Sequence, residues 1–250
     1  MLTLVGLGLF DEKDLTLRGI EVAKSADKIY LETYTSNWQG KIENLENILG
    51  KEISALSRID LEDNSKLILD EAKTKHVVIF VGGDPLVATT HSSILLGARK
   101  SGVETKVVHN ASIVSAIAET GLHVYKFGAT VTIPFLEKTK GTLPESVYRT
   151  IAENKNLGLH TLCLLDIADG SMTINKGLNI LLQLGKNSAE NLLDENSEAV
   201  VFSIGEKSSI VFGKISELLN ANIDFLPAVI ILPGSLHFTE REFLHQYKLI

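Results

Sequence analysis

The sequence predicts an α/β fold made of two α/β domains with a cofactor cleft between them. In residues 1–110, short apolar runs rich in β-branched residues alternate five times with stretches at helical spacing, which is typical of a parallel sheet covered on both faces. Beyond residue 110, two short apolar runs at 199–204 and 209–213 lie so close together that antiparallel pairing is expected. We therefore expect a parallel-sheet domain over residues 1–110 and a mixed-sheet domain over residues 111–250.

The composition is that of an ordinary globular protein, since 44% of the 250 residues are hydrophobic and 22% are charged. The formal net charge of −7 argues against a general nucleic-acid binder, which usually presents a basic face. No apolar run approaches the ~18 residues of a membrane span, and the N-terminus lacks the basic region of a signal peptide. The single cysteine, Cys163, excludes an internal disulfide and fits a reducing compartment. We expect a cytoplasmic protein with no nucleic-acid or membrane partner.

The elements of the first domain follow from their apolar patterns. Strands are expected where apolar residues run together, at residues 2–5, 28–31, 52–56, 77–81 and 105–108. Helices are expected where apolar residues recur every three or four positions, over residues 16–25, 42–49, 61–74 and 88–100. The first helix would place Leu17 and Ile20 on its apolar face, and the third would bury Leu67, Ile68 and Ala72. Gly50 would end the second helix, because glycine readily adopts the left-handed C-terminal cap.

The strands and helices of the second domain are predicted from the same apolar patterns. A helix opens within residues 109–116, where Ser112 is a natural N-cap. Strands are then expected at 130–133, 161–166, 199–204, 209–213 and 228–232, and helices at 144–153, 175–184, 189–194, 215–219 and 238–248. Cys163 lies inside an apolar run and is expected in the core.

The most informative stretch is the strand at 77–81 with the residues that follow it, Gly82-Gly83-Asp84-Pro85. The glycines permit a sharp turn and a close approach by a ligand, and the proline ends the strand. In an open α/β sheet, ligands bind at the carboxyl ends of strands, in turns of this kind. An Asp at a strand-to-helix turn is about as often a cap as a ligand, so both interpretations of Asp84 stand.

A second glycine turn, Gly6-Leu7-Gly8-Leu9, invites comparison with dinucleotide-binding turns. The third glycine of that fingerprint falls at Asp11, whose carboxylate would face a pyrophosphate, so we reject a dinucleotide site. The two glycine turns, at 6–9 and 82–85, and the strand ends at 110–113 and 164–166 are four clusters that could line one cleft. Backbone, aliphatic side chains and Asp84 suit an adenine and a sulfonium better than a phosphate.

Several enzyme classes find no support in the sequence. It contains no H-E-x-x-H or Cys-His cluster with zinc spacing, and we expect no metal. It also lacks the G-x-S-x-G elbow of serine hydrolases and the P-loop pattern of nucleotide hydrolases.

A family resemblance emerges from longer segments in a fixed order. They are Val5 to Leu9 with Asp11 and Asp14, Tyr34 to Ser36, Gly83 to His91, Val108 to Ile113, Gly121 to Gly128, His160 to Ile167 and Leu232 to His237. Over nearly its whole length the chain resembles the diphthine synthases, a family within the tetrapyrrole methylase superfamily. The resemblance implies an S-adenosylmethionine-dependent methyltransferase acting on the amino group of a 3-amino-3-carboxypropyl-modified histidine of translation elongation factor 2. Trimethylation without esterification would give diphthine, and a homodimer is implied by analogy.

By the family pattern, the cofactor contacts fall on Leu9, Asp84, Val87, Ser112, Ile113 and Leu165. Two more positions align less closely with the family. Ile204 lies where relatives have an Ala-Arg-x-Gly turn, and Ala228 stands where they usually have a histidine, so any side-chain contact there is lost and only a backbone contact can survive.

No catalytic residue is assigned. Asp84, Asp166, His109 and His123 are candidate proton acceptors, and the alternative is that positioning of the amine alone is sufficient for the transfer. The alternatives are a tetrapyrrole methyltransferase of the same superfamily, acting on a corrin or porphyrin precursor, and a non-catalytic S-adenosylmethionine-binding protein.

Overall fold

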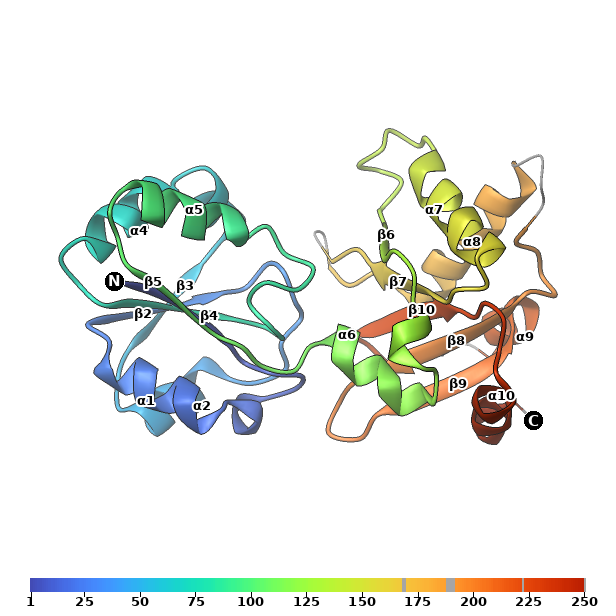
Figure 1. The fold of residues 1–250 in the computed structure, drawn as a ribbon, viewed down its shortest axis with the longest axis horizontal. Coiled ribbons are helices and arrows are strands. Elements are labelled where there is room, and N and C mark those ends of the chain that lie inside the picture. Colours follow the sequence, from blue (N-terminus) through green and yellow to red (C-terminus); the bar gives the residue numbers. More distant parts are fainter. Residues whose placement is uncertain (168–169, 188–191, 222, 250) are drawn as a thin grey trace. The chain divides into compact units, whose positions relative to one another are not determined.

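The computed structural model describes residues 1–167, 170–187, 192–221 and 223–249 of the chain. They form two compact units, Met1–Ala116 and Ile117–Ile250, each with its own five-stranded sheet (Figure 1). The division falls a few residues beyond the boundary suggested at residue 110, because the short helix α6 (Ile113–Ala116) stays with the first unit.

The sheet of the first unit is entirely parallel, with strand order β3-β2-β4-β1-β5. Its strands are β1 (Leu2–Gly6), β2 (Lys28–Glu32), β3 (Ile53–Leu56), β4 (Val77–Val81) and β5 (Thr105–Val108). One face packs against α1 (Leu17–Ser25) and α2 (Ile42–Leu49), and the other against α3 (Arg58–Glu62), α4 (Ser65–Ala72) and α5 (Ser92–Lys100) (Figure 1). The central strands β1 and β4 are buried throughout, which explains their continuous apolar sequences.

The sheet of the second unit is mixed, with strand order β6-β7-β10-β8-β9. Its strands are β6 (Val131–Ile133), β7 (Thr161–Leu165), β8 (Glu198–Ser203), β9 (Ser209–Lys214) and β10 (Ala228–Leu232). Only β6 and β7 pair in parallel, and the β8–β9 pair is antiparallel as the sequence predicts. The helices are α7 (Glu145–Asn156), α8 (Ile174–Lys186), α9 (Ile215–Asn220) and α10 (Phe238–Leu244), and 3₁₀ turns lie at Glu12–Asp14, Ile117–Thr120, Val124–Lys126 and His245–Tyr247.

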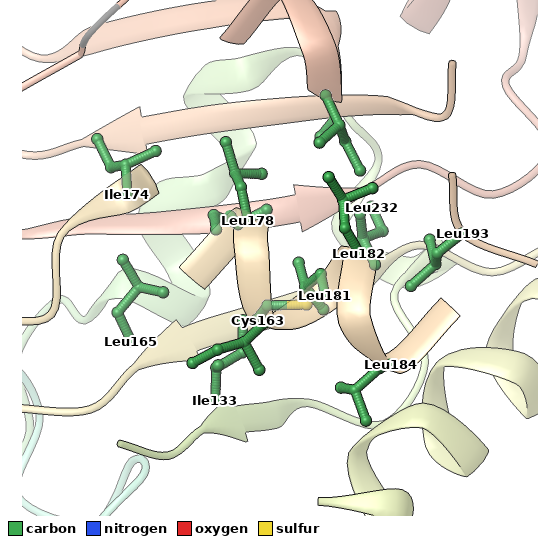
Figure 2. Packing of buried hydrophobic residues seen from close by; sticks show 14 of the residues in the cluster. Ile133, Cys163, Leu165, Ile174, Leu178, Leu181, Leu182, Leu184, Leu193 and Leu232 are labelled. Atoms are coloured by element: carbon green, nitrogen blue, oxygen red, sulfur yellow. The ribbon is translucent and has the colours of Figure 1, made fainter. Parts of the chain in front are cut away.

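The core of the second unit centres on α8, whose leucines pack over the strands (Figure 2). Cys163 of β7 points into this cluster and is fully buried, as expected of a small core residue. Burial raises the pKa of its thiol, because the thiolate would lie in an apolar environment.

Several sequence predictions about helices are wrong in detail. Leu17 and Leu67 are 80% and 75% exposed, since α1 buries Gly19, Val22 and Ala23 instead, and α4 buries Ile68 and Ala72. The helix expected over 61–74 is two helices: α3, which starts early because Ser57 and Asp60 form a capping box, and α4, which begins at Ser65.

Two further helices differ from the sequence prediction in their residues. The helix expected from residue 88 begins at Ser92, because Ala88 adopts a left-handed φ of 55°. Residues 189–191 of the helix expected over 189–194 lie outside the described residues, and residues 192–194 are not helical.

No helix among the described residues is long and apolar enough to cross a membrane.

Candidate cofactor site

Two glycine turns meet at the carboxyl edge of the first sheet, because β1 and β4 are neighbours there. The amide of Gly83 donates to the carbonyl of Gly8 at 2.9 Å, and the amide of Gly8 donates to the carbonyl of Gly83 at 3.2 Å. Their φ angles of +85° for Gly8 and +70° for Gly83 are strained for any residue with a Cβ. The structure thus brings together the two turns that the sequence singled out.

Asn110, at the end of β5, ties a third segment to these turns. Its side-chain amide donates to the carbonyls of Gly6 and Asp14, both at 3.0 Å, and its backbone amide donates to Asp84 Oδ2 at 3.2 Å. The carboxylate of Asp14 in turn accepts from the backbone amide of Leu9 at 3.0 Å. Sequence reasoning placed Asn110 in a cluster but gave it no role, since long-range amide contacts leave no local signal.

Asp84 is buried, and its two carboxylate oxygens are both used within the first unit. Oδ1 accepts from the amide of Leu86 at 3.0 Å, and Oδ2 accepts from Nδ1 of His109 at 2.8 Å as well as from Asn110. The capping interpretation therefore describes what the side chain does here, and its negative charge remains beside the glycine turns.

The other predicted positions of the first unit lie around the same edge. Ser112 is buried, and it lies beside Gly83: a Cβ built on Gly83 would be 3.8 Å from the Ser112 Cβ. Ile113 follows as the first residue of α6, and the amide of Val87 donates to the carbonyl of Asp84 at 3.3 Å. Leu9, Asp84, Val87, Ser112 and Ile113 thus belong to three segments that meet at one edge of one sheet.

The three predicted positions of the second unit form a group of their own. Leu165 ends β7 and Ala228 starts β10, and these neighbouring strands pair Leu164 with Val229. Ala228 also pairs with Ser203 at the end of β8, directly before Ile204. The fold therefore gathers Leu165, Ile204 and Ala228 at one edge of the second sheet.

Two of the candidate proton acceptors are already engaged in the second unit. Asp166 binds Nζ of Lys138, with both carboxylate oxygens within 2.8 Å. The ring of His123 stacks on Tyr125 at 5.3 Å between ring centroids, and its Nδ1 lies 3.0 Å from the Tyr125 hydroxyl.

A buried carboxylate that sequence reasoning missed, Glu240 of α10, holds three of the resemblance segments together. It accepts from the amides of His123 and His237 at 2.9 and 2.7 Å, from Nε2 of His160 at 3.0 Å, and from Nζ of Lys126. Burial opposes its ionisation, but the Lys126 ammonium and the amide donors hold the pKa of Glu240 at about 2. No periodicity distinguishes it from the exposed Glu242 nearby.

The first-unit edge fits a flat, uncharged or cationic group held by backbone contacts. A Cβ on Gly83 would meet no atom closer than 3.8 Å, so a ligand can approach the chain closely at this point. The fixed charges among the contacts of this first-unit edge are the carboxylates of Asp14 and Asp84, which favour a sulfonium over a phosphate. No three His, Cys, Asp or Glu side chains of the described ranges are placed so that they could hold a metal ion.

Known proteins match this architecture along almost the whole chain. The family model of tetrapyrrole (corrin/porphyrin) methylases matches residues 1–219. The diphthine synthase of Methanocaldococcus jannaschii is 44% identical over 98% of this chain and 97% of its own length, and that of Methanococcus aeolicus is 44% identical over 98% and 96%.

The chain belongs to the diphthine synthase family.

A crystal structure of a diphthine synthase superposes with a TM-score of 0.89 at 34% identity, covering 99% of this chain and 95% of the other. As a diphthine synthase family member, the chain has the tetrapyrrole methylase fold that the sequence predicted. It is an S-adenosylmethionine-dependent methyltransferase of diphthamide biosynthesis.

Proposed function

We propose that the chain methylates the amino group of a 3-amino-3-carboxypropyl-modified histidine on translation elongation factor 2, and that three transfers give diphthine. The observation that carries this proposal is the match to diphthine synthases over 98% of the chain, which leaves neither unit outside the likeness. A cytoplasmic location and a homodimer belong to the same proposal, by analogy with the superfamily.

The cofactor contacts we propose are Leu9, Asp84, Val87, Ser112 and Ile113 in the first unit and Leu165, Ile204 and Ala228 in the second. Their placement at two strand-end edges supports this assignment, because ligands of α/β proteins bind at such edges. Since its carboxylate oxygens are already bonded, Asp84 acts through its backbone and its charge. Ala228 has no polar side chain, so its contact is a backbone one.

When bound, S-adenosylmethionine supplies a methyl group on a sulfonium, which an amine displaces in line. The chain must hold the amine on that axis, exclude water and accept a proton from the ammonium, because only the neutral amine attacks.

His109 is the proton acceptor that the geometry favours. Asp84 can only accept while it is ionised, so Nδ1 of His109 carries the proton that it donates at 2.8 Å. This bond orients the ring and leaves Nε2 as the basic nitrogen on a side chain that is 67% exposed.

The proposal is tested by incubating the chain with methyl-labelled S-adenosylmethionine and elongation factor 2 that carries the 3-amino-3-carboxypropyl histidine. Label on the factor that resists mild alkali supports amine methylation, and mass spectrometry of the modified peptide counts the methyl groups. Unmodified factor is the matched control and should take up no label. A parallel incubation replaces the factor with a tetrapyrrole precursor. Label on that precursor and not on the factor, or label on neither, would overturn the proposal.

A further inference from the structure

The turn that follows β4 holds a backbone shape that its own residues do not favour. Ala88 has a φ of 55°, a left-handed conformation that an L-residue with a Cβ adopts only when its surroundings impose it. Asp84 fixes the first half of the turn by accepting from the amides of Leu86 and Val87. Something else must fix the second half, up to the start of α5.

The carbonyl of Pro85 is the point at which the second half is held. It accepts from the hydroxyl of Thr89 at 3.0 Å and from Nδ1 of His91 at 3.1 Å. A carbonyl can only accept, so Nδ1 of His91 carries a proton and donates it. The His91 side chain is almost fully buried, at 3% exposure for the residue, which makes this hydrogen bond hard to replace by water.

The opposite side of the His91 ring faces the end of β2. Nε2 has no hydrogen-bond partner among the described residues and lies 4.0 Å from Oε2 of the buried Glu32. Tyr34 contacts the ring edge-on, at 6.2 Å between centroids. Glu32 is itself fixed, because both of its oxygens accept from Thr35. These contacts restrict how the imidazole can turn, so Nδ1 stays directed at Pro85.

We propose that His91 is a positioning residue for the cofactor, acting through the Pro85 carbonyl to hold the turn that contains Asp84 and Val87. Glu32 and Tyr34 keep its ring in the orientation that this hydrogen bond requires. The inference rests on the proposed cofactor contacts of Asp84 and Val87. It also gives a role to the Thr-Thr-His run at 89–91, which the resemblance includes and the cofactor contacts leave unused.

The test compares His91→Leu, which removes the donor, with His91→Asn, whose side-chain nitrogen occupies the position of Nδ1. Calorimetry with S-adenosylhomocysteine should show about tenfold weaker binding for the leucine variant, because one buried hydrogen bond is lost. The asparagine variant should bind within about twofold of the wild type. With saturating cofactor, kcat should change less than the KM for S-adenosylmethionine.

Amide hydrogen exchange in the ligand-free protein gives a second readout. The amides of Leu86 and Val87 should exchange faster in His91→Leu than in the wild type and His91→Asn. Thr90→Ala is the matched control, since the Thr90 hydroxyl contacts exposed Glu62 instead of Pro85, and it should leave both readouts unchanged. If His91→Leu does not fold, Thr89→Val removes the other donor to the same carbonyl, and the same weakening is expected.

Wild-type affinity in the leucine variant, or equal weakening in the asparagine variant, would overturn the role of His91. A wild-type chain that binds no cofactor would instead refute the proposed cofactor site, so the two failures are distinguishable.

Discussion

Glu240 offers the sharpest test of how the second unit is held together. It is fully buried and accepts from two backbone amides, a histidine and a lysine, which lower its pKa from an ordinary 4.5 to about 2. A difference of about 2.5 between these pKa values, at ~1.4 kcal/mol for each pKa unit, corresponds to roughly 3 to 4 kcal/mol of folding free energy near neutral pH. Glu240→Gln should therefore lower the free energy of unfolding by roughly 3 to 4 kcal/mol at pH 7, because the charge that pairs with Lys126 is lost.

The pH dependence of this effect has a defined sign. The folded pKa is depressed, so the stabilisation is fully present above the unfolded value near 4.5 and is lost as the pH falls through about 2. The difference in stability between wild type and Glu240→Gln should shrink over this acid range.

Urea unfolding followed by far-UV circular dichroism measures the difference. The only tryptophan, Trp38, lies in the first unit, so its fluorescence follows that unit separately. Glu242→Gln, on an exposed position of the same helix, is the matched control and should change the stability by less than about 0.5 kcal/mol. Equal stability of Glu240→Gln and wild type at pH 7, or a difference that does not vary with pH, would refute the reasoning.

Three further outcomes are expected. Asp84→Ala should weaken S-adenosylmethionine binding by about tenfold in calorimetry, because it releases the Gly82–Val87 turn from the end of β5; unchanged affinity would count against the cofactor site. His109→Asn should lower kcat for transfer to modified elongation factor while the cofactor affinity stays near wild type, and an unchanged kcat across a pH series would exclude His109 as the proton acceptor. Cys163 should resist a thiol reagent in the native protein and react once urea unfolds it, since burial raises its pKa; rapid native labelling would contradict its place in the core.

The sequence alone predicts most of the fold because strong local patterns specify it. Fully buried strands such as β1 and β4 must be apolar on both faces, and this leaves a continuous apolar run. Glycines that allow a turn, and a proline that cannot continue a strand, mark where those strands end. The parallel first sheet and the mixed second sheet could both be inferred for these reasons.

The errors fall where local pattern and tertiary packing disagree. Leu17 and Leu67 have the spacing of core residues, but the faces of α1 and α4 that meet the sheet are set by smaller neighbours. The start of α5 depends on the φ of Ala88, which the surroundings of the turn impose.

By itself, the sequence determined the strand-end turns, the acidic and backbone character of the candidate site, and the resemblance to a methyltransferase family. Only the tertiary structure decided what the polar side chains do, because their partners are far apart in the chain. In the tertiary structure the side-chain amide of Asn110 donates to the Gly6 carbonyl, and the carboxylate oxygens of Asp84 accept from His109 and Leu86. Glu240 is buried among hydrogen-bond donors from three separate segments. Hydrogen bonds between such distant residues depend on how the sheets are ordered, and no local periodicity records that order.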